Sequence, residues 1–471
     1  MKKIILLSFL LFSAFAISSV SSFAQPGGGG GGGGGSTVAY SHGATLVITE
    51  PATYTGKSYT QTGSDYNVVK DTCATATLVN CTLTKTGATS SSGDNSSFYG
   101  INAALYASKT GVLTMTGGSI TTNADGANAA FCYNGGTLNL YNVTIYNSAT
   151  RSRGLHCTGG NGATINAYNC TVTTLKETSS TIATDRGGGT VYVNGGTYTA
   201  NGSKCAIVYS TGNMTVKNIT GYSNNSSQGD IADIEGDNSI TIDSCHLTCS
   251  GTSRGVMLYQ SGSGDASGYN PVMKISNSTL TLTSSAAPFC EVSTAVNAYL
   301  ILDNDSINCP AGVLAYVHTN SNWNNTHAKY LNLSLKRGTY YGALNADATG
   351  AIHAAVAADA VWQGAVDNAA TASADTVVVS GTWIMDAAAN VDVLIINQGG
   401  IVYTNGFKLT VTKTTNNGTL DTTSTGITAG MVTLQAPATD GKTYTLDGKQ
   451  VDGTHLLRGF YIKNGKKIWV K

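Results

Sequence analysis

A short pattern of alternating apolar residues returns along residues 38–325 at intervals of 23 to 37 residues. Its form is apolar-x-apolar-x-(Asn or Gly)-x-x-apolar, as in LNLYNVTI at 138–145 and MKISNSTL at 273–280. The Asn or Gly position falls at Asn80, Gly117, Asn142, Asn169, Gly195, Asn218, Ser244, Asn277 and Asn304. A repeat of this length is typical of a solenoid, in which each repeat forms one coil.

The pattern also predicts how the coils are built. Alternation points every second side chain of a strand to the same face, and Asn and Gly tolerate the left-handed conformation of a tight turn. Stacked coils then pair each strand in parallel with its copy, at about 4.8 Å per coil. One inward column is predicted to contain Leu140, Ala167, Val193, Val216, Ile242, Ile275 and Leu302.

The predicted fold class is therefore all-β, a right-handed parallel β-helix, with the hand taken from the general crossover preference. An antiparallel sandwich is the alternative, but it would not keep one turn residue in phase over nine repeats. Charged residues make up only 11% of the chain, and Lys+Arg and Asp+Glu are both 26. No basic field exists to hold a nucleic acid.

The two ends of the chain differ from the repeats. Residues 1–24 are typical of a secretory signal peptide, whose apolar stretch is too short to span a membrane. Residues 25–37 are a Gly-rich linker. In residues 326–436 the Asn turn fades, and the Ala-rich part at 343–374 fits a helix as well as further solenoid coils. Residues 437–471 are predicted to form a small hairpin domain with turns at Asp447-Gly448 and Asn464-Gly465.

Three resemblances follow from these motifs. The repeats resemble those of the pectate-lyase superfamily and of bacterial surface solenoids. The stretches at 362–369 and 381–413 resemble the passengers of pertactin-like adhesins. LDGKQV at 446–451, the strand at 459–462 and NGKK at 464–467 resemble the sorting domain of Bacteroidetes type nine secretion cargo. They imply export through the periplasm by a secretion machinery, to the outer cell surface or beyond, with no transmembrane segment in the mature chain.

Ten cysteines in an exported chain suggest disulfides. Cys81, Cys170 and Cys245 share an inward position but lie coils apart, so we expect them to be buried as small hydrophobic residues. Cys132 and Cys157 have a similar phase on adjacent coils, where a disulfide and two free thiols are equally compatible with the sequence. No Cys/His spacing suggests a zinc site.

The densest acidic segment is GDIADIEGDNSITID at 229–243. Asp233 and Glu235 are predicted to point outward from one strand, about 6.5–7 Å apart. This leaves room for a cation such as Ca²⁺ or for acid/base chemistry across a sugar bond, with Arg254 and His156 as companions. The alternative is a solvated acidic strand with no such role. The Gly-His-Gly and Arg-Ile-Lys segments that polygalacturonase-like enzymes use are absent from the sequence.

Aromatic residues recur on a second strand of each coil. Aligning ALYASKTG, AFCYNGG, AIVYSTG, VMLYQSG and LAYVHTN predicts a nearly common outward column, which also holds Glu235. The column contains Tyr106, Tyr133, Tyr209, Tyr259 and Tyr316. Outward tyrosines can stack on sugar rings, although Tyr also simply suits a half-exposed strand.

Threonine is dense in TLTKT, SITT, TVTT and TLTLT. Regular outward threonine ranks on a flat solenoid can bind ice, but here Gly, Lys and Asn are expected to break the ranks. The sequence therefore predicts an adhesin-like or glycan-binding, non-catalytic β-helix whose partners are glycans or other cell-surface ligands. The alternative is a carbohydrate-active lyase or hydrolase on the same scaffold.

Overall fold

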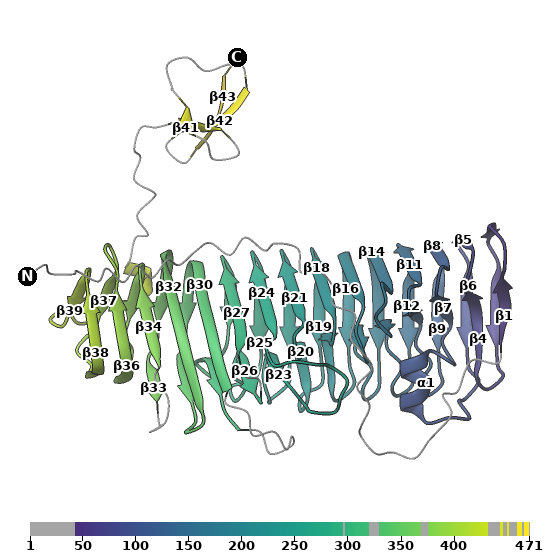
Figure 1. Ribbon diagram of the computed structural model, residues 1–471, viewed down its shortest axis with the longest axis horizontal. Helices are drawn as coiled ribbons and strands as arrows, with labels where there is room; N and C mark the ends of the chain where they lie inside the picture. The colour runs from purple at the N-terminus through teal and green to yellow at the C-terminus, as the bar shows by residue number, and fades with distance from the viewer. Residues whose placement is uncertain are drawn as a thin grey trace, which may run out of the picture. The chain divides into compact units, whose positions relative to one another are not determined.

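The computed structural model describes residues 43–294, 297–319, 329–368 and 375–431, together with 443–445, 450–451, 459–463 and 466–470. Two parallel sheets contain all the described strands of the solenoid, β1 to β39, with successive coils side by side (Figure 1). Sheet A has 13 strands, and sheet B has 26. The prediction of a parallel β-helix is thus confirmed.

Sheet A contains β1 (Gly43–Ile48), β4 (Tyr66–Asp71), β7 (Leu105–Ser108), β10 (Ala130–Tyr133), β13 (Leu155–Thr158), β15 (Ile182–Asp185), β17 (Cys205–Ser210), β20 (Gly229–Glu235), β23 (Val256–Tyr259), β26 (Cys290–Ser293), β29 (Val313–Val317), β31 (Ala343–Ala346) and β33 (Val366–Asn368).

Sheet B begins with β2 (Ala52–Thr55), β3 (Ser58–Gln61), β5 (Thr75–Val79), β6 (Thr82–Lys85), β8 (Val112–Thr116), β9 (Ser119–Thr122), β11 (Thr137–Tyr141), β12 (Thr144–Asn147), β14 (Thr164–Thr174), β16 (Thr190–Ala200), β18 (Asn213–Lys217), β19 (Thr220–Ser223), β21 (Ser239–Asp243) and β22 (His246–Cys249). It continues with β24 (Val272–Ser276), β25 (Thr279–Leu282), β27 (Ala298–Asp303), β28 (Ser306–Asn308), β30 (Lys329–Tyr341), β32 (Gly350–Gln363), β34 (Thr376–Val379), β35 (Thr382–Ile384), β36 (Ala389–Ile396), β37 (Ile401–Tyr403), β38 (Leu409–Asn416) and β39 (Thr419–Asp421). Two short helices are described, α1 (Gly93–Tyr99) and the 3₁₀ turn η1 (Ala429–Met431).

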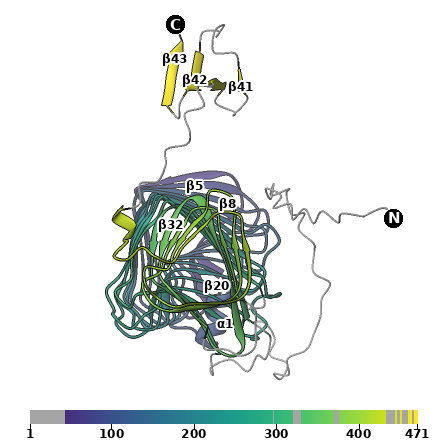
Figure 2. The same ribbon diagram turned by 90° about the vertical axis from the view of Figure 1, so that its left-hand side faces the viewer.

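The predicted inward column is present. Leu140 pairs with Ala167, Ala167 with Val193, and the same register continues through the rest of the column to Leu302. All seven side chains are fully buried. Seen along the stack of coils, the strands superpose around this core (Figure 2). Burial of apolar side chains along the whole stack is the main stabilising contribution to such a fold.

The predicted turn geometry is also present. All nine turn residues have a positive φ, from 50° at Asn80 to 77° at Gly195. Glycine is required at Gly117 and Gly195, because a Cβ there would lie 2.3 and 2.2 Å from the Asn Oδ1 of the preceding coil. Two turn asparagines on adjacent coils are hydrogen-bonded, with Asn304 Nδ2 donating to Asn277 Oδ1 at 3.0 Å.

Residues 343–368 of the Ala-rich segment form solenoid strands rather than a helix, and the remainder of the segment lies outside the described residues. β31, β32 and β33 occupy it and pair in parallel with the preceding coils. Both sheets contain strands on either side of the predicted boundary between residues 325 and 326. Two buried tryptophans stack between neighbouring coils here, with the Trp362 and Trp383 rings 5.0 Å apart.

Four C-terminal strands pair in antiparallel fashion in a separate sheet. They are β40 (Thr443–Thr445), β41 (Gln450–Val451), β42 (Gly459–Lys463) and β43 (Lys466–Val470). The two predicted turns, the signal peptide and the linker lie outside the described residues.

The cysteines are all free thiols. Cys132 and Cys157 are register partners on sheet A, and both are buried inside the coil. Cys81, Cys170 and Cys245 are buried as expected. The disulfides that the even number of cysteines suggested are therefore not formed.

The exposed side of the shorter sheet B strands carries two columns of polar residues, which we call the threonine face. One column contains Ser58, Thr82, Ser119, Thr144, Thr171, Thr197, Thr220, His246, Thr279 and Ser306. The other contains Thr60, Thr84, Thr121, Tyr146, Thr173, Thr199, Tyr222, Thr248, Thr281 and Asn308.

The expectation that Gly and Lys break these ranks is wrong. Lys85 follows Thr84 but points inward, where its Nζ donates to the Gly63 and Gly87 carbonyl oxygens at 2.7 and 2.9 Å. Gly221 takes the inward position of its strand between the two columns. Alternation along each strand places both residues inward. The ranks are interrupted instead by Asn308, as expected for Asn, and by Tyr146, Tyr222 and His246.

Candidate functional site

The outer side of sheet A is the most unusual surface of the coils, because much of it is buried. In an open solenoid, outward side chains meet solvent. Here Phe131 and His156 have no exposed surface, and Asp185, Glu235 and Met257 are no more than 2% exposed. Polar and charged side chains are therefore buried on the outer face of the sheet. Because this face points away from the apolar core, the core does not account for their burial.

The tyrosine column is corrected by the register of sheet A. Tyr106, Tyr209 and Tyr316 belong to one column, whereas Tyr133 and Tyr259 belong to the column two residues further along each strand. Glu235 is in the second column, next to Tyr259. The alignment failed because a shift of two residues keeps a side chain on the same face.

Most of these rings are engaged by the protein itself. Tyr106 stacks on Phe131 with ring centroids 5.7 Å apart, and Phe131 stacks on Tyr133 at 6.3 Å. Tyr316 stacks on His318 at 4.3 Å. The Tyr209 and Tyr259 hydroxyls are hydrogen-bonded to each other, and burial raises the pKa of both. The five tyrosines thus do not form one continuous open strip.

Two insertions cover this side of the sheet. The first is α1, which starts at the Ser92 cap, whose side chain accepts from the Asn95 amide, and ends at Gly100 in the left-handed conformation. Thr158 on β13 donates to the Phe98 carbonyl oxygen at 2.7 Å and so docks the helix. The second is the loop 260–271, where the Asp265 carbonyl oxygen accepts from the Gly187 amide at 3.2 Å.

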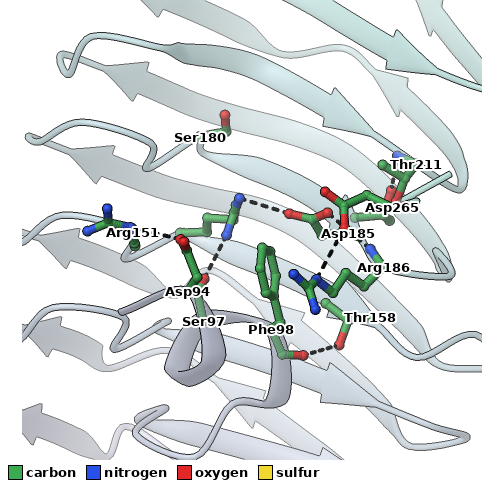
Figure 3. Close-up of polar contacts among 12 residues, drawn as sticks. Asp94, Ser97, Phe98, Arg151, Thr158, Ser180, Asp185, Arg186, Thr211 and Asp265 are labelled. Carbon is green, nitrogen blue, oxygen red and sulfur yellow. Dashed lines mark hydrogen bonds and ion pairs between the residues drawn. The ribbon is translucent and has the colours of Figure 1, made fainter. Parts of the chain in front are cut away.

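A pocket of about 210 Å³ remains between the two insertions. Several of its residues are drawn in Figure 3. It is lined by Asp94, Phe98, Arg153, Thr178, Ser180, Asp185, Lys204, Tyr209 and Asp265. Within one small space the pocket thus presents two aromatic rings, three hydroxyls, three carboxyls and two cationic side chains.

A buried ion pair forms the floor of the pocket. The Arg153 Nη2 lies 2.9 Å from the Asp185 Oδ2, and the Arg153 Nη1 donates to the Ser97 Oγ on α1 at 2.6 Å. Burial raises the pKa of Asp185 to about 6 despite the opposing charge of Arg153. Asp185 is therefore a carboxyl group that exchanges its proton close to neutral pH, a property found often at functional sites.

Phe98 lies between two guanidinium groups. The centre of the Arg186 guanidinium is 4.0 Å from the ring centroid, and that of Arg153 is 5.7 Å from it. Arg186 also pairs with Asp265 at 3.2 Å, as Figure 3 shows. Cation–π contacts and ion pairs of this kind hold α1 and the loop 260–271 in place around the pocket.

Asp233 and Glu235 belong to two different networks. Glu235 accepts from the Ser261 amide at 3.1 Å and from the Ser261 hydroxyl, and burial raises its pKa. Asp233 is half-buried and lies 4.0 Å from Arg254, the predicted companion. Burial and the neighbouring Asp230 raise the pKa of Asp233.

Arg254 links this acidic cluster to the next coils. It contacts Asp230 at 3.0 Å and Glu291 at 3.1 Å, and His318 contacts Glu291 at 3.2 Å. Burial favours a higher pKa for Glu291, but His318 and Arg254 together lower it to about 2. Three carboxyl groups thus share one arginine and one histidine in a largely buried cluster, which the interpretation of a solvated acidic strand does not describe.

His156 does not join Asp233 or Glu235. Its ring packs against Phe131 at 5.4 Å, and neither ring nitrogen has a hydrogen-bond partner among the described residues. Burial and the nearby Arg153 lower the pKa of His156. In the described part of the chain, no group of three or more His, Cys, Asp or Glu side chains is arranged to hold a metal ion.

Of the residues that line the pocket, the sequence analysis identified Tyr209 and missed the others. α1, Arg153, Asp185 and Asp265 lie in or beside insertions between strands, where the repeat carries no phase information. One available signal was the run Asp185-Arg186-Gly187-Gly188-Gly189, which combines two charges with a flexible turn at the end of a strand.

Comparison with protein-family models, with curated proteins and with solved structures gives no match. Within the described residues, no helix has the length and hydrophobicity that a membrane crossing needs.

The raised pKa of Asp185 gives a testable pH dependence. The ordinary pKa of this group is 3.8, so unfolding releases its proton between about pH 4 and 6. The free energy of unfolding therefore falls as pH rises through this window. Asp185→Asn is expected to flatten this slope by up to about 1.4 kcal/mol per pH unit, measured by chemical denaturation.

Asp421→Asn is the contrast variant. Hydrogen bonds from Ser424 and Thr423 lower the pKa of Asp421 from 3.8, so the slope that this variant removes has the opposite sign and lies below about pH 4, outside the window of Asp185. An Asp185→Asn chain with the same slope as the unmodified protein would show that the carboxyl titrates normally.

Proposed function

We propose that this chain is an exported β-helix protein that binds glycans at the pocket on the outer side of sheet A, without turning them over. The pocket carries the proposal, because sugar rings are recognised by planar polar groups next to an aromatic ring. Tyr209, which is half-buried, supplies the ring, and Thr178, Ser180 and Lys204 supply hydrogen-bonding groups. The ligands are glycans of a cell surface or of the surroundings.

The size of the pocket favours a small part of a glycan. Its volume of about 210 Å³ is below the roughly 300–1,000 Å³ of pockets that enclose drug-sized ligands. The buried Arg153–Asp185 pair already compensates its own charge, so hydrogen bonding rather than net charge would select the ligand. These features support one terminal sugar residue as the bound group.

Glycan cleavage is the second candidate, and one observation favours it. Asp185 has a pKa of about 6, which suits a general acid at neutral pH, and Asp265 is a second carboxylate on the same pocket. Glycan binding and glycan cleavage can be distinguished by product, because a protein that only binds a glycan releases no oligosaccharide.

A glycan array run in parallel with a depolymerisation assay separates these functions. Lys204→Met is expected to weaken glycan binding about fivefold, because it removes one hydrogen-bonding group of roughly 1 kcal/mol. Tyr209→Leu is expected to weaken binding by a similar factor, because it removes the ring on which a sugar stacks. Lys217→Met is the control, since the exposed Lys217 pairs with Asp243 on sheet B much as Lys204 pairs with Glu177 beside the pocket. If oligosaccharides are released and Asp185→Asn abolishes this release, the function is glycan cleavage rather than binding. An equal loss of glycan binding in all three variants would exclude the pocket as the binding site.

The proposal of export rests on the two ends of the sequence. Residues 1–24 carry the features of a signal peptide, and residues 437–471 resemble a type nine sorting domain. Deleting residues 437–471 is expected to retain the chain in the periplasm, because the secretion machinery would no longer recognise it. Cell fractionation measures this, and unchanged release into the medium would contradict a sorting role.

A further inference from the structure

The threonine face of sheet B is a second surface that the pocket does not involve. Sixteen of its twenty positions are Thr or Ser, and none is Asp, Glu, Lys or Arg. All twenty are exposed or half-buried. Among the described residues, none of the threonine hydroxyls of this face makes a hydrogen bond to another protein group. The face therefore offers unsatisfied hydroxyls and methyl groups in a regular array.

The neighbouring face of sheet B shows that this is not a general property of the coils. Its outward positions on β18, β21, β24 and β27 include Lys217, Asp243, Lys274 and Asp303. The threonine face therefore has no charged side chain, whereas the neighbouring face of the same sheet has charged side chains on the same coils. Solubility alone gives no reason for such a difference, because both faces are accessible to water.

The spacing of the array is set by the backbone. Along the stack, equivalent hydroxyls are about 4.8 Å apart, and the two columns are about 6.5–7 Å apart. Tyr146 and Tyr222 stand in one column, three coils apart, at about 14 Å. Their side chains are 43% and 39% exposed, so these rings project from the array.

We propose that the threonine face binds an extended, uncharged polysaccharide that lies along the stack of coils. The coil spacing is close to the length of one pyranose residue in an extended chain, so successive sugars can meet successive coils. Threonine hydroxyls donate to and accept from sugar hydroxyls, and Tyr146 and Tyr222 offer rings on which sugars stack. Many weak contacts in series then add up to useful affinity.

Two other occupants fit the face less well. An ice surface needs a flat array, but Tyr146, Tyr222 and His246 interrupt the threonines. A protein partner would be expected to meet an interface rich in aromatic residues and Arg, and this face has no Arg. The absence of charge also argues against an acidic polysaccharide as the bound polymer.

This inference extends the proposed glycan-binding role to a second surface and rests on different residues. The test is electrophoresis of the purified protein through gels that contain a neutral polysaccharide. Suitable probes are hydroxyethylcellulose, mixed-linkage β-glucan and glucomannan, with polygalacturonate as the charged comparison. Retardation by at least one neutral polymer, and none by polygalacturonate, is expected.

Matched variants locate the binding surface. Thr121→Glu with Thr248→Glu places two charges on the threonine face and is expected to weaken retardation at least tenfold. Thr114→Glu with Thr241→Glu is the control, because these half-buried threonines lie on the same two coils but on the neighbouring face. Tyr146→Ala with Tyr222→Ala is also expected to weaken retardation, whereas Tyr299→Ala, a tyrosine 40% exposed elsewhere on sheet B, is not.

Each remaining outcome counts against the proposal. Equal effects of the two glutamate pairs, or no retardation by any neutral polymer, would overturn it. Inhibition of ice recrystallisation without retardation would assign the face to ice instead. The pocket variant Tyr209→Leu is expected to keep its retardation, so loss in that variant alone would assign the polymer to the pocket. Thermal unfolding of each variant checks that it is folded. Where a glutamate pair is not folded, the variant with Tyr146→Ala and Tyr222→Ala supplies the test instead.

Discussion

In-register parallel pairing between successive coils is the constraint on which the rest of this structure depends. Each strand satisfies its backbone groups through the coils on either side, so a residue is forced next to its equivalent one coil away. Leu140, Ala167 and Val193 are neighbours for this reason and not because of any specific attraction between them. The same register that builds an apolar column inside also builds columns outside, and the chemistry of those outer columns decides what the surface can bind.

The two sheets use this rule in opposite ways. On sheet A, α1 and the loop 260–271 cover the outer columns, which permits a buried pair such as Arg153 and Asp185 and leaves one pocket between the insertions. On the threonine face, the described residues leave the columns open, and hydroxyl groups repeat at the spacing of the backbone. A built pocket suits a single sugar, and a repeating array suits a polymer. A surface protein with both would hold a glycan at two scales.

The features that depend only on the repeat period were predicted correctly from the sequence. It placed the inward column, the left-handed turns and the buried Cys81, Cys170 and Cys245, because each depends only on alternation and a turn signal. It did not predict the pocket, because Phe98 and Asp265 come from insertions whose positions depend on contacts between distant coils. The tyrosines were assigned to one column instead of two since a two-residue shift leaves the pattern unchanged. Whether 343–374 is helix or strand was likewise decided by pairing with neighbouring coils, which propensity does not encode.

The distance between outward positions tests the central claim most directly. Spin labels can be attached to cysteines placed at Thr84 and Thr199, or at Thr84 and Thr281, in a chain whose exposed Cys73 is replaced by Ser. These pairs lie four and seven coils apart in one column. Pulsed electron paramagnetic resonance should give backbone separations of about 19 and 34 Å, after allowance for the label arms. Distances that do not grow with the number of intervening coils would contradict the stacking and every surface derived from it.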